Sequence, residues 1–302
     1  MIFQLSKRRL KKKIKGKVII ITGASSGIGR VVAIELANYN PKLVIIARRA
    51  KKLLETSRLL KEKGIEFAPI VGDVRNNEDL ENIIEAALQK FGTIDILVNN
   101  AGLGKVNLFV NQPEEDIDQL LDTNIKALIK LTRKTLPIMK ENGGGHIVNI
   151  SSSMFLFPSY PFAVYSATKA AVKVFSDCIR EEVKNYGIEI STVLPGPYNT
   201  EFNQVAGIDP KYMPGFDVNK LSQRIVRLIA NPKHTIIQPW FYRILIVISN
   251  LFPGIQKTLG SHISKLAIRG IPQNAQFLVN KPDIIDRKIK EKEVDVLSQQ
   301  IN

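Results

Sequence analysis

Short, continuous apolar runs alternate with amphipathic stretches along most of this chain. The runs are rich in Val and Ile, which is typical of strands that are buried on both faces of a sheet. They predict strands at residues 17–22, 42–47, 65–73, 94–100, 146–151, 188–196 and 234–239. Between them, apolar positions recur with helical spacing at residues 28–40, 48–64, 77–92, 114–140, 162–186 and 217–231.

This alternation predicts one α/β domain. Strands that alternate with helices imply right-handed crossovers, and therefore a doubly wound parallel sheet flanked by helices. We expect this domain to occupy residues 16–238. The remaining segments are a basic N-terminal arm at 1–15, an apolar and basic helical extension at 239–270, and a charged tail at 271–302.

The positive charge of the chain is unevenly distributed. The 302 residues carry a formal net charge of +15. Residues 1–15 hold seven Lys or Arg and no acid, and residues 211–270 hold nine basic residues and one acid. Such clusters favour an anionic surface, either phospholipid or nucleic acid. No base-reading motif supports nucleic acid. For the arm, which lacks the apolar core of a secretory signal, a solvated tail is the alternative.

The cysteine and histidine content sets two further expectations. Cys178 is the only cysteine, so no internal disulfide can form, which fits a reducing, cytoplasmic location. The three histidines are far apart in the sequence and have no cluster of cysteines or carboxylates beside them. We therefore expect no metal site.

A glycine-rich loop follows the first strand and opens the first helix. Glycines there allow the backbone to approach a pyrophosphate, and the helix offers free N–H groups. The candidate cofactor contacts are Thr22, Gly23, Ser25, Ser26, Gly27, Ile28 and Gly29. The second strand ends at Arg48, and no acid lies between Lys42 and Lys52. Because arginine suits a 2′-phosphate, we expect NADP(H) rather than NAD(H).

Further motifs follow in a fixed order. "TGASSGIG" at 22–29 and "NNAG" at 99–102 are followed by Ser152, Tyr165 and Lys169. Over residues 16–238, this set resembles the compact single-domain branch of the short-chain dehydrogenase/reductase family. The resemblance implies a Rossmann-like fold and hydride transfer between NADP(H) and a carbonyl or secondary alcohol. A catalytically silent NADPH-binding scaffold is the alternative, against which the intact catalytic residues argue.

Tyr165 and Lys169 are one helical turn apart and share a face. An ammonium about 4 Å from the phenol contributes roughly 4 kcal/mol at an effective dielectric of about 20. At about 1.4 kcal/mol for each pKa unit, this predicts that the pKa of Tyr165 falls by about three units, to near neutrality. A group that titrates there is suited to general acid–base catalysis.

The family resemblance also implies a role for each matching residue. Tyr165 exchanges the proton, Lys169 also holds the nicotinamide ribose, and Ser152 orients the substrate oxygen. Asn124 is similar to the asparagine that holds a proton-relay water. The remaining implied cofactor contacts are Asp73, Val74, Asn99, Ala101, Gly102, Pro195, Gly196 and Thr200.

Large apolar residues surround the catalytic pair and the segment expected to form a lid, residues 197–217. They are Met154, Phe155, Leu156, Phe157, Phe162, Phe202, Met213 and Phe216. They favour an apolar small molecule, such as a lipid-, steroid- or retinoid-like compound, although packing beneath a loop would explain them equally well.

Residues 239–254 form a late apolar segment that contains one charge, Arg243. Its 13 uncharged residues from Ile244 to Gln256 would span about 20 Å as a helix, against about 30 Å of hydrocarbon. We therefore expect a helix at a membrane interface, in the core or in a homodimer contact. One hypothesis is that it docks on lipid together with the basic arm. Because it follows the last expected strand, we expect it to lie outside the catalytic machinery.

Overall fold

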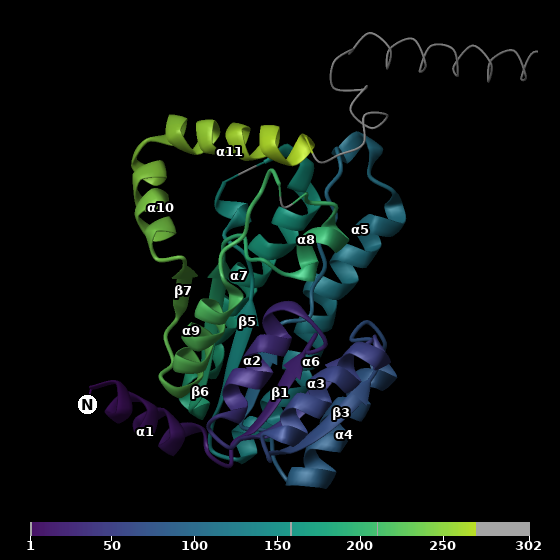
Figure 1. Ribbon diagram of the computed structural model, residues 1–302, viewed down its shortest axis with the longest axis vertical. Helices are drawn as coiled ribbons and strands as arrows, with labels where there is room; N and C mark the ends of the chain where they lie inside the picture. The colour runs from purple at the N-terminus through teal and green to yellow at the C-terminus, as the bar shows by residue number, and fades with distance from the viewer. Residues whose placement is uncertain (1, 158, 210, 270–302) are drawn as a thin grey trace, which may run out of the picture.

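The structure, a computed structural model, describes residues 2–157, 159–209 and 211–269. A parallel seven-stranded sheet forms its centre, in the order β3-β2-β1-β4-β5-β6-β7 (Figure 1). The strands are β1 (Val18–Thr22), β2 (Lys42–Ala47), β3 (Glu66–Val71), β4 (Ile96–Asn99), β5 (Gly145–Ile150), β6 (Ile188–Pro195) and β7 (Thr235–Gln238). The predicted doubly wound α/β fold is confirmed.

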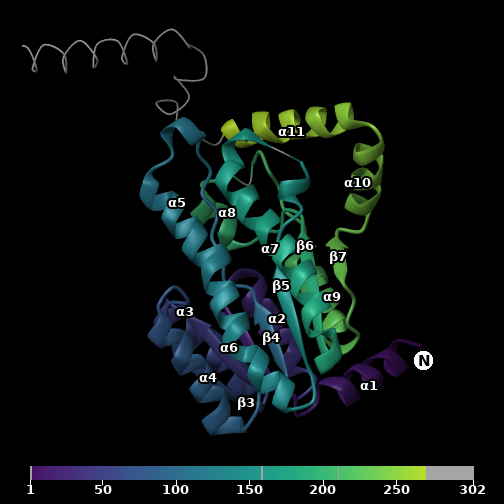
Figure 2. The ribbon, with the colours of Figure 1, turned by 180° about the vertical axis from the view of Figure 1, so that it is seen from behind.

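Helices cover both faces of the sheet. One face carries α2 (Gly27–Ala37), α3 (Ala50–Glu62) and α9 (Val218–Ala230), and the other carries α4 (Asn77–Phe91), α6 (Ala127–Glu141) and α7 (Ala163–Val183) (Figures 1 and 2). Successive strand residues alternate between the two layers: Ile19 and Ile21 pack on the first, and Ile20 packs on the second. This two-sided burial explains why the strands are continuously apolar.

The chain order reverses between β1 and β4, which pair directly with Ile20 opposite Leu97. In open α/β sheets, ligands bind outside the carboxyl ends of the strands at such a point. The loops and short helices there are η1 (Phe109–Asn111), α5 (Glu114–Leu121), the π-helical turn η2 (Asp122–Lys126), η3 (Met154–Leu156), η4 (Tyr160–Phe162) and α8 (Glu201–Ala206). The helix predicted at 114–140 is therefore divided by η2, and η5 (Lys184–Tyr186) extends α7.

The basic arm is a helix, α1 (Ile2–Ile14), rather than a solvated tail. Leu10 and Ile14 are buried in the same core layer as α2 and α9. The Lys13 ammonium donates to Asn231 Oδ1 over 2.9 Å, just beyond the end of α9. The amphipathic pattern is weak in the sequence, because three lysines separate the two buried positions, Leu10 and Ile14.

The C-terminal extension forms α10 (Phe241–Leu251) and α11 (Pro253–Ile268) at the carboxyl ends of the strands. Both views place α1 at the opposite end of the molecule (Figures 1 and 2). Both views also draw α10 and α1 along the same side of the molecule (Figures 1 and 2), so joint docking of the two segments on lipid stays a prediction. Within the described part of the chain, no helix is both long and apolar enough to cross a membrane. The tail predicted at 271–302 lies outside the described residues.

Candidate active site

A cavity of about 430 Å³ lies at the carboxyl ends of the strands. It brings together most of the residues that the sequence predicted, from loops far apart in the chain. Those that line it are Gly23, Ser25, Ser26, Gly27, Ile28, Arg48, Asp73, Val74, Ala101, Gly102, Ser152, Tyr165, Lys169, Pro195, Gly196 and Thr200. Thr22, Gly29, Asn99 and Asn124 do not line it, and each has a different position.

The glycine loop fits a dinucleotide by its backbone shape. Gly23 and Gly27 have φ angles of +68° and +53°, which side chains rarely adopt. The loop then enters α2, whose first residues, Gly27 and Ile28, line the cavity and leave N–H groups free for a phosphate. Gly29 instead permits close packing, because a Cβ there would lie 2.4 Å from Asn100 Nδ2 and 2.5 Å from Gly23 O. Gly29 therefore supports the loop without lining the cavity.

Thr22 and the "NNAG" segment connect β1 to β4. The buried Thr22 hydroxyl accepts hydrogen bonds from the backbone N–H groups of Asn100 and Ala101. Asn99 was predicted to line the cofactor site, but its side chain does not reach the cavity, so a contact with the cofactor stays a prediction. Its side chain enters the core, where Nδ2 donates to Thr132 Oγ1 and Asn149 Oδ1. The neighbouring Asn100 lines the cavity instead.

The far end of the cavity is rich in charge. Arg48 lies 3.7 Å from Asp73. The adjacent Arg49 donates to Ser26 Oγ over 2.6 Å and pairs with Glu201 at 3.0 Å. Burial acts to raise the pKa of Asp73, but hydrogen bonds from Arg75 outweigh it and hold the pKa below its ordinary value. Two guanidinium groups and a hydroxyl thus face the end where an adenosine ribose would lie.

The catalytic residues meet at the centre of the cavity. Tyr165 and Lys169 project from one face of α7, and Ser152 lies on the loop after β5. The Lys169 ammonium donates to the Ile150 carbonyl over 3.1 Å and lies 5.8 Å from the centroid of the Tyr165 ring. The Ser152 hydroxyl accepts a hydrogen bond from the Met154 N–H over 3.1 Å.

The predicted fall in the pKa of Tyr165 is not observed. Burial raises the pKa of this phenol to about 12, and the contact with Ser152 only partly opposes the rise. Burial also lowers the pKa of Lys169 to about 8. The predicted fall requires an ammonium about 4 Å from the phenol at an effective dielectric of about 20. Here the ammonium is turned towards Ile150, and removal of water is the dominant effect.

Asn124 lies in the π-helical turn between α5 and α6, a distortion that is frequent at functional sites. Its side chain is buried and bonded to its surroundings. Oδ1 accepts from the Leu103 N–H, and Nδ2 donates to the Leu103 carbonyl and the Thr168 hydroxyl. Asn124 therefore fixes the loop after β4 against α7. The proton-relay water stays a prediction.

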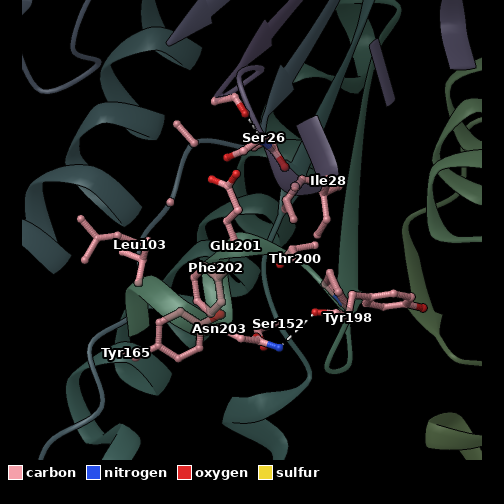
Figure 3. Close-up of a pocket in the computed structure, with 18 of the residues that line it drawn as sticks. Ser26, Ile28, Leu103, Ser152, Tyr165, Tyr198, Thr200, Glu201, Phe202 and Asn203 are labelled. Carbon is pink, nitrogen blue, oxygen red and sulfur yellow. Dashed lines mark hydrogen bonds between the residues drawn. The ribbon is translucent and has the colours of Figure 1, made fainter. Parts of the chain in front are cut away.

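The other half of the cavity is apolar. Of the predicted residues, Met154, Phe157, Phe162, Phe202 and Met213 line it, whereas Phe155, Leu156 and Phe216 do not. The rings of Phe162 and Phe202 lie 6.5 and 5.7 Å from that of Tyr165, and Figure 3 shows Phe202 beside the tyrosine.

The C-terminal extension also contributes to the cavity, contrary to expectation. Tyr242 of α10 and Ile263 of α11 line it. Gln256 Nε2 donates to the Leu156 carbonyl over 2.8 Å, and Ser264 Oγ accepts from the Tyr160 N–H over 3.1 Å. These bonds hold α11 over the apolar half. A tyrosine and an isoleucine in an apolar run carry no local signal of such a role, so the sequence could not reveal it.

The residues present therefore fit a dinucleotide along the polar half of the cavity, while apolar side chains line the other half. Within residues 2–157, 159–209 and 211–269, no three His, Cys, Asp or Glu side chains gather as metal ligands do.

Comparisons with known proteins agree with this geometry. The chain matches the family described as short chain dehydrogenase over residues 17–210. The 11-beta-hydroxysteroid dehydrogenase-like 2 protein of Arabidopsis thaliana is 33% identical over 261 residues, which cover 83% of each chain. A solved short-chain dehydrogenase from Sphingobium yanoikuyae in complex with NADPH is similar with a TM-score of 0.71 and 31% identity, over 79% of this chain and 94% of its own. A 3-ketoacyl-(acyl-carrier-protein) reductase from Brucella melitensis complexed with NADH has a TM-score of 0.69 and 28% identity, over 74% of this chain and 97% of its own. The protein thus belongs to the short-chain dehydrogenase family of NAD(P)-dependent oxidoreductases.

Proposed function

We propose that this protein is an NADP(H)-dependent reductase of an apolar carbonyl compound. The position of Tyr165 carries the proposal, because this phenol lies where the two halves of the cavity meet. Towards one end are the glycine loop and the arginines, and towards the other are aromatic and methionine side chains. A carbonyl held beside Tyr165 would keep its apolar body out of water and its oxygen against the catalytic hydroxyls.

The protein groups then support reduction. NADPH, when bound, supplies a hydride to the carbonyl carbon. The Ser152 hydroxyl orients the carbonyl oxygen, and the Tyr165 phenol donates its proton to that oxygen to give the alcohol. With a pKa of about 12, the phenol retains this proton at neutral pH. The Lys169 ammonium, 5.8 Å from the ring centroid, stabilises the phenolate that remains until a proton from solvent restores it.

The preference for NADP(H) rests on Arg48 and Arg49. Their guanidinium groups can hold a 2′-phosphate through charge and paired N–H donors, and no carboxylate follows β2 to hold a ribose diol. The Arg48→Ala variant should weaken NADPH binding by about tenfold or more and NADH binding by less than about twofold, as measured by calorimetry. Equal losses would contradict the preference. Arg58→Ala, on the exposed part of α3, is the control.

The apolar substrate class rests on the lining of the cavity and gains support from the name of the Arabidopsis relative, which refers to a hydroxysteroid. A panel of steroid, retinoid, fatty and short polar ketones or aldehydes with NADPH tests it through loss of cofactor fluorescence. The larger apolar compounds should show the higher kcat/KM. A preference for polar sugars would overturn the proposal.

Turnover itself separates an enzyme from a silent scaffold. Tyr165→Phe should reduce kcat by about a thousandfold or more, because it removes the proton donor, while NADPH still binds. Tyr160→Phe is a matched control, since Tyr160 is 47% exposed. Unchanged turnover in Tyr165→Phe would refute the catalytic assignment.

We also propose that α10 contacts an anionic membrane surface. The outer face of α10 is not buried in the core, because the side chains of Ile244, Val247 and Leu251 are 50%, 55% and 70% exposed. Trp240 and Phe252 at its ends are 65% and 60% exposed. Such a contiguous apolar surface indicates an interaction site, and a tryptophan suits a headgroup layer.

Charge favours lipid over a second copy of the chain at this surface. Residues 239–269 contain Arg243, Lys257, Lys265 and Arg269 but no Asp or Glu. Two such surfaces would repel each other in a homodimer, whereas acidic phospholipid attracts them. Since Tyr242 and Ile263 line the cavity from the same two helices, docking would bring the cavity beside the source of an apolar substrate.

Flotation with vesicles of phosphatidylcholine and phosphatidylserine tests this contact. The double variant Ile244→Ser and Leu251→Ser should lose binding by about tenfold or more, since each change removes several buried CH₂ groups. Leu54→Ser with Val71→Ser is the control, because these side chains are 53% and 58% exposed on α3 and β3. A wild-type dimer that this α10 variant converts to a monomer, without vesicle binding, would overturn the proposal.

A further inference from the structure

Glu201 connects the lid to the cofactor end of the cavity. It is the first residue of α8, within the segment that covers the cavity. Figure 3 shows its carboxylate pointing towards Ser26, whereas the next residue, Phe202, points towards Tyr165. One short helix therefore presents adjacent side chains to the cofactor end and to the catalytic tyrosine.

The Glu201 carboxylate is bound by the cations at that end. Oε2 accepts from Arg49 Nη1 over 3.0 Å, and Oε1 accepts from Lys52 Nζ over 2.5 Å. The same Arg49 donates through Nη2 to the Ser26 hydroxyl over 2.6 Å. Hydrogen bonds from Lys52 contribute most to a pKa of Glu201 below its ordinary value, so the carboxylate is ionised at neutral pH.

These contacts are those that a 2′-phosphate would also seek. A phosphate and a carboxylate both bind a guanidinium through two anionic oxygens, and the Ser26 hydroxyl adds a donor beside Arg49. We infer that Glu201 is a specificity-determining residue that competes with the 2′-phosphate of NADP(H) for Arg49 and Lys52, and so limits the preference for NADP(H) over NAD(H). NAD(H) lacks this phosphate and does not enter the competition.

The inference rests on the proposed preference for NADP(H), and its own test is the change in cofactor affinity that Glu201→Gln causes. Calorimetry of NADP⁺, NAD⁺ and adenosine 2′-monophosphate is compared between the wild type and Glu201→Gln. Without the rival charge, NADP⁺ and adenosine 2′-monophosphate should bind about tenfold more tightly, as expected for a unit charge a few ångströms from a partly exposed phosphate. NAD⁺ should change by less than about twofold. Glu62→Gln, which removes the same charge at the far end of α3, is the control.

A double-mutant cycle identifies Arg49 as the shared partner. If Glu201 acts by occupying Arg49, most of the gain from Glu201→Gln should disappear in an Arg49→Ala background. Thermal unfolding of each variant verifies that it is folded.

These measurements test the preference for NADP(H) and the competition by Glu201 separately. A wild type that binds NADP⁺ no more tightly than NAD⁺ removes the proposed preference. A wild type that prefers NADP⁺, with a Glu201→Gln variant whose affinity for NADP⁺ is unchanged or weaker, overturns only the competition. Equal changes for NADP⁺ and NAD⁺ would show that Glu201 merely fastens the lid, and would also overturn it.

Discussion

The Lys169→Met substitution removes an ammonium that is buried at the centre of the cavity. Lys169 is 5% exposed, and burial lowers its pKa from 10.5 to about 8. At about 1.36 kcal/mol for each pKa unit, the charged form costs the folded state about 3 kcal/mol at neutral pH. The variant also loses the hydrogen bond to the Ile150 carbonyl, worth about 1 kcal/mol. We therefore expect Lys169→Met to be more stable than the wild type by about 2 kcal/mol at pH 7, and inactive.

The stability advantage of Lys169→Met should depend on pH, whereas a change in packing alone would give the same difference at every pH. Between pH values of about 8 and 10.5, the unfolded chain holds the Lys169 proton and the folded chain does not. Wild-type stability from this residue therefore rises across that window and is lowest below it. The Met variant has no such group, so its advantage should shrink as the pH rises and reverse near pH 10.

Urea unfolding at a series of pH values measures the effect. Lys173→Met, one turn further along α7, is the control, because its surface ion pair with Asp177 predicts a change of less than about 1 kcal/mol. A destabilised Lys169→Met variant at pH 7, or an advantage that does not depend on pH, would refute the reasoning.

Three other predictions follow from the site. The kcat/KM for reduction should be flat from pH 6 to about 8 and should fall at higher pH as Lys169 loses its charge. The kcat/KM for oxidation should rise with pH as Tyr165 ionises. A kcat/KM for reduction that increases above pH 8 would contradict these pKa values. Asn124→Ala should lower the free energy of unfolding by about 2–4 kcal/mol, because it leaves the Leu103 N–H and carbonyl without their partner. An unchanged free energy of unfolding in urea would contradict this prediction. Phe202→Ala should raise KM for a large ketone by about tenfold with a smaller effect on kcat; a fall in kcat with KM unchanged would instead indicate that Phe202 positions the Tyr165 ring.

Local sequence patterns were sufficient for the sheet and the catalytic centre. A strand such as 18–22 has four consecutive apolar residues before Thr22, and this continuous run predicts its burial on both faces. The Tyr165 and Lys169 pair needs only helical spacing to share a face. Asn99 and Asn100 show the limit of this reasoning, since both are polar and adjacent. Only the register of β4 with β5, which places Asn99 beside Asn149, decides which of them enters the core.

Long-range packing accounts for what the sequence did not reveal. Arg49 and Glu201 meet across 152 positions of the chain, and nothing in the sequence beside either residue indicates this contact. The pKa values likewise depend on how completely Tyr165 and Lys169 are removed from water. For Tyr165, part of this burial comes from α8 and α11, whose residues share its apolar cluster, and no spacing along the chain encodes it.

The docking of α1 has a consequence for the order in which the protein is made. Lys13 and its partner Asn231 are 218 positions apart, so the ribosome releases the first helix long before the surface that receives it exists. Until α9 has been synthesised, Leu10 and Ile14 have no native partner in that part of the core. This basic, amphipathic helix therefore remains undocked through most of translation, and it can pack on the domain only after α9 has been synthesised. A chain cut short before residue 218 would lack α9 and would carry this helix undocked, with Leu10 and Ile14 deprived of that burial.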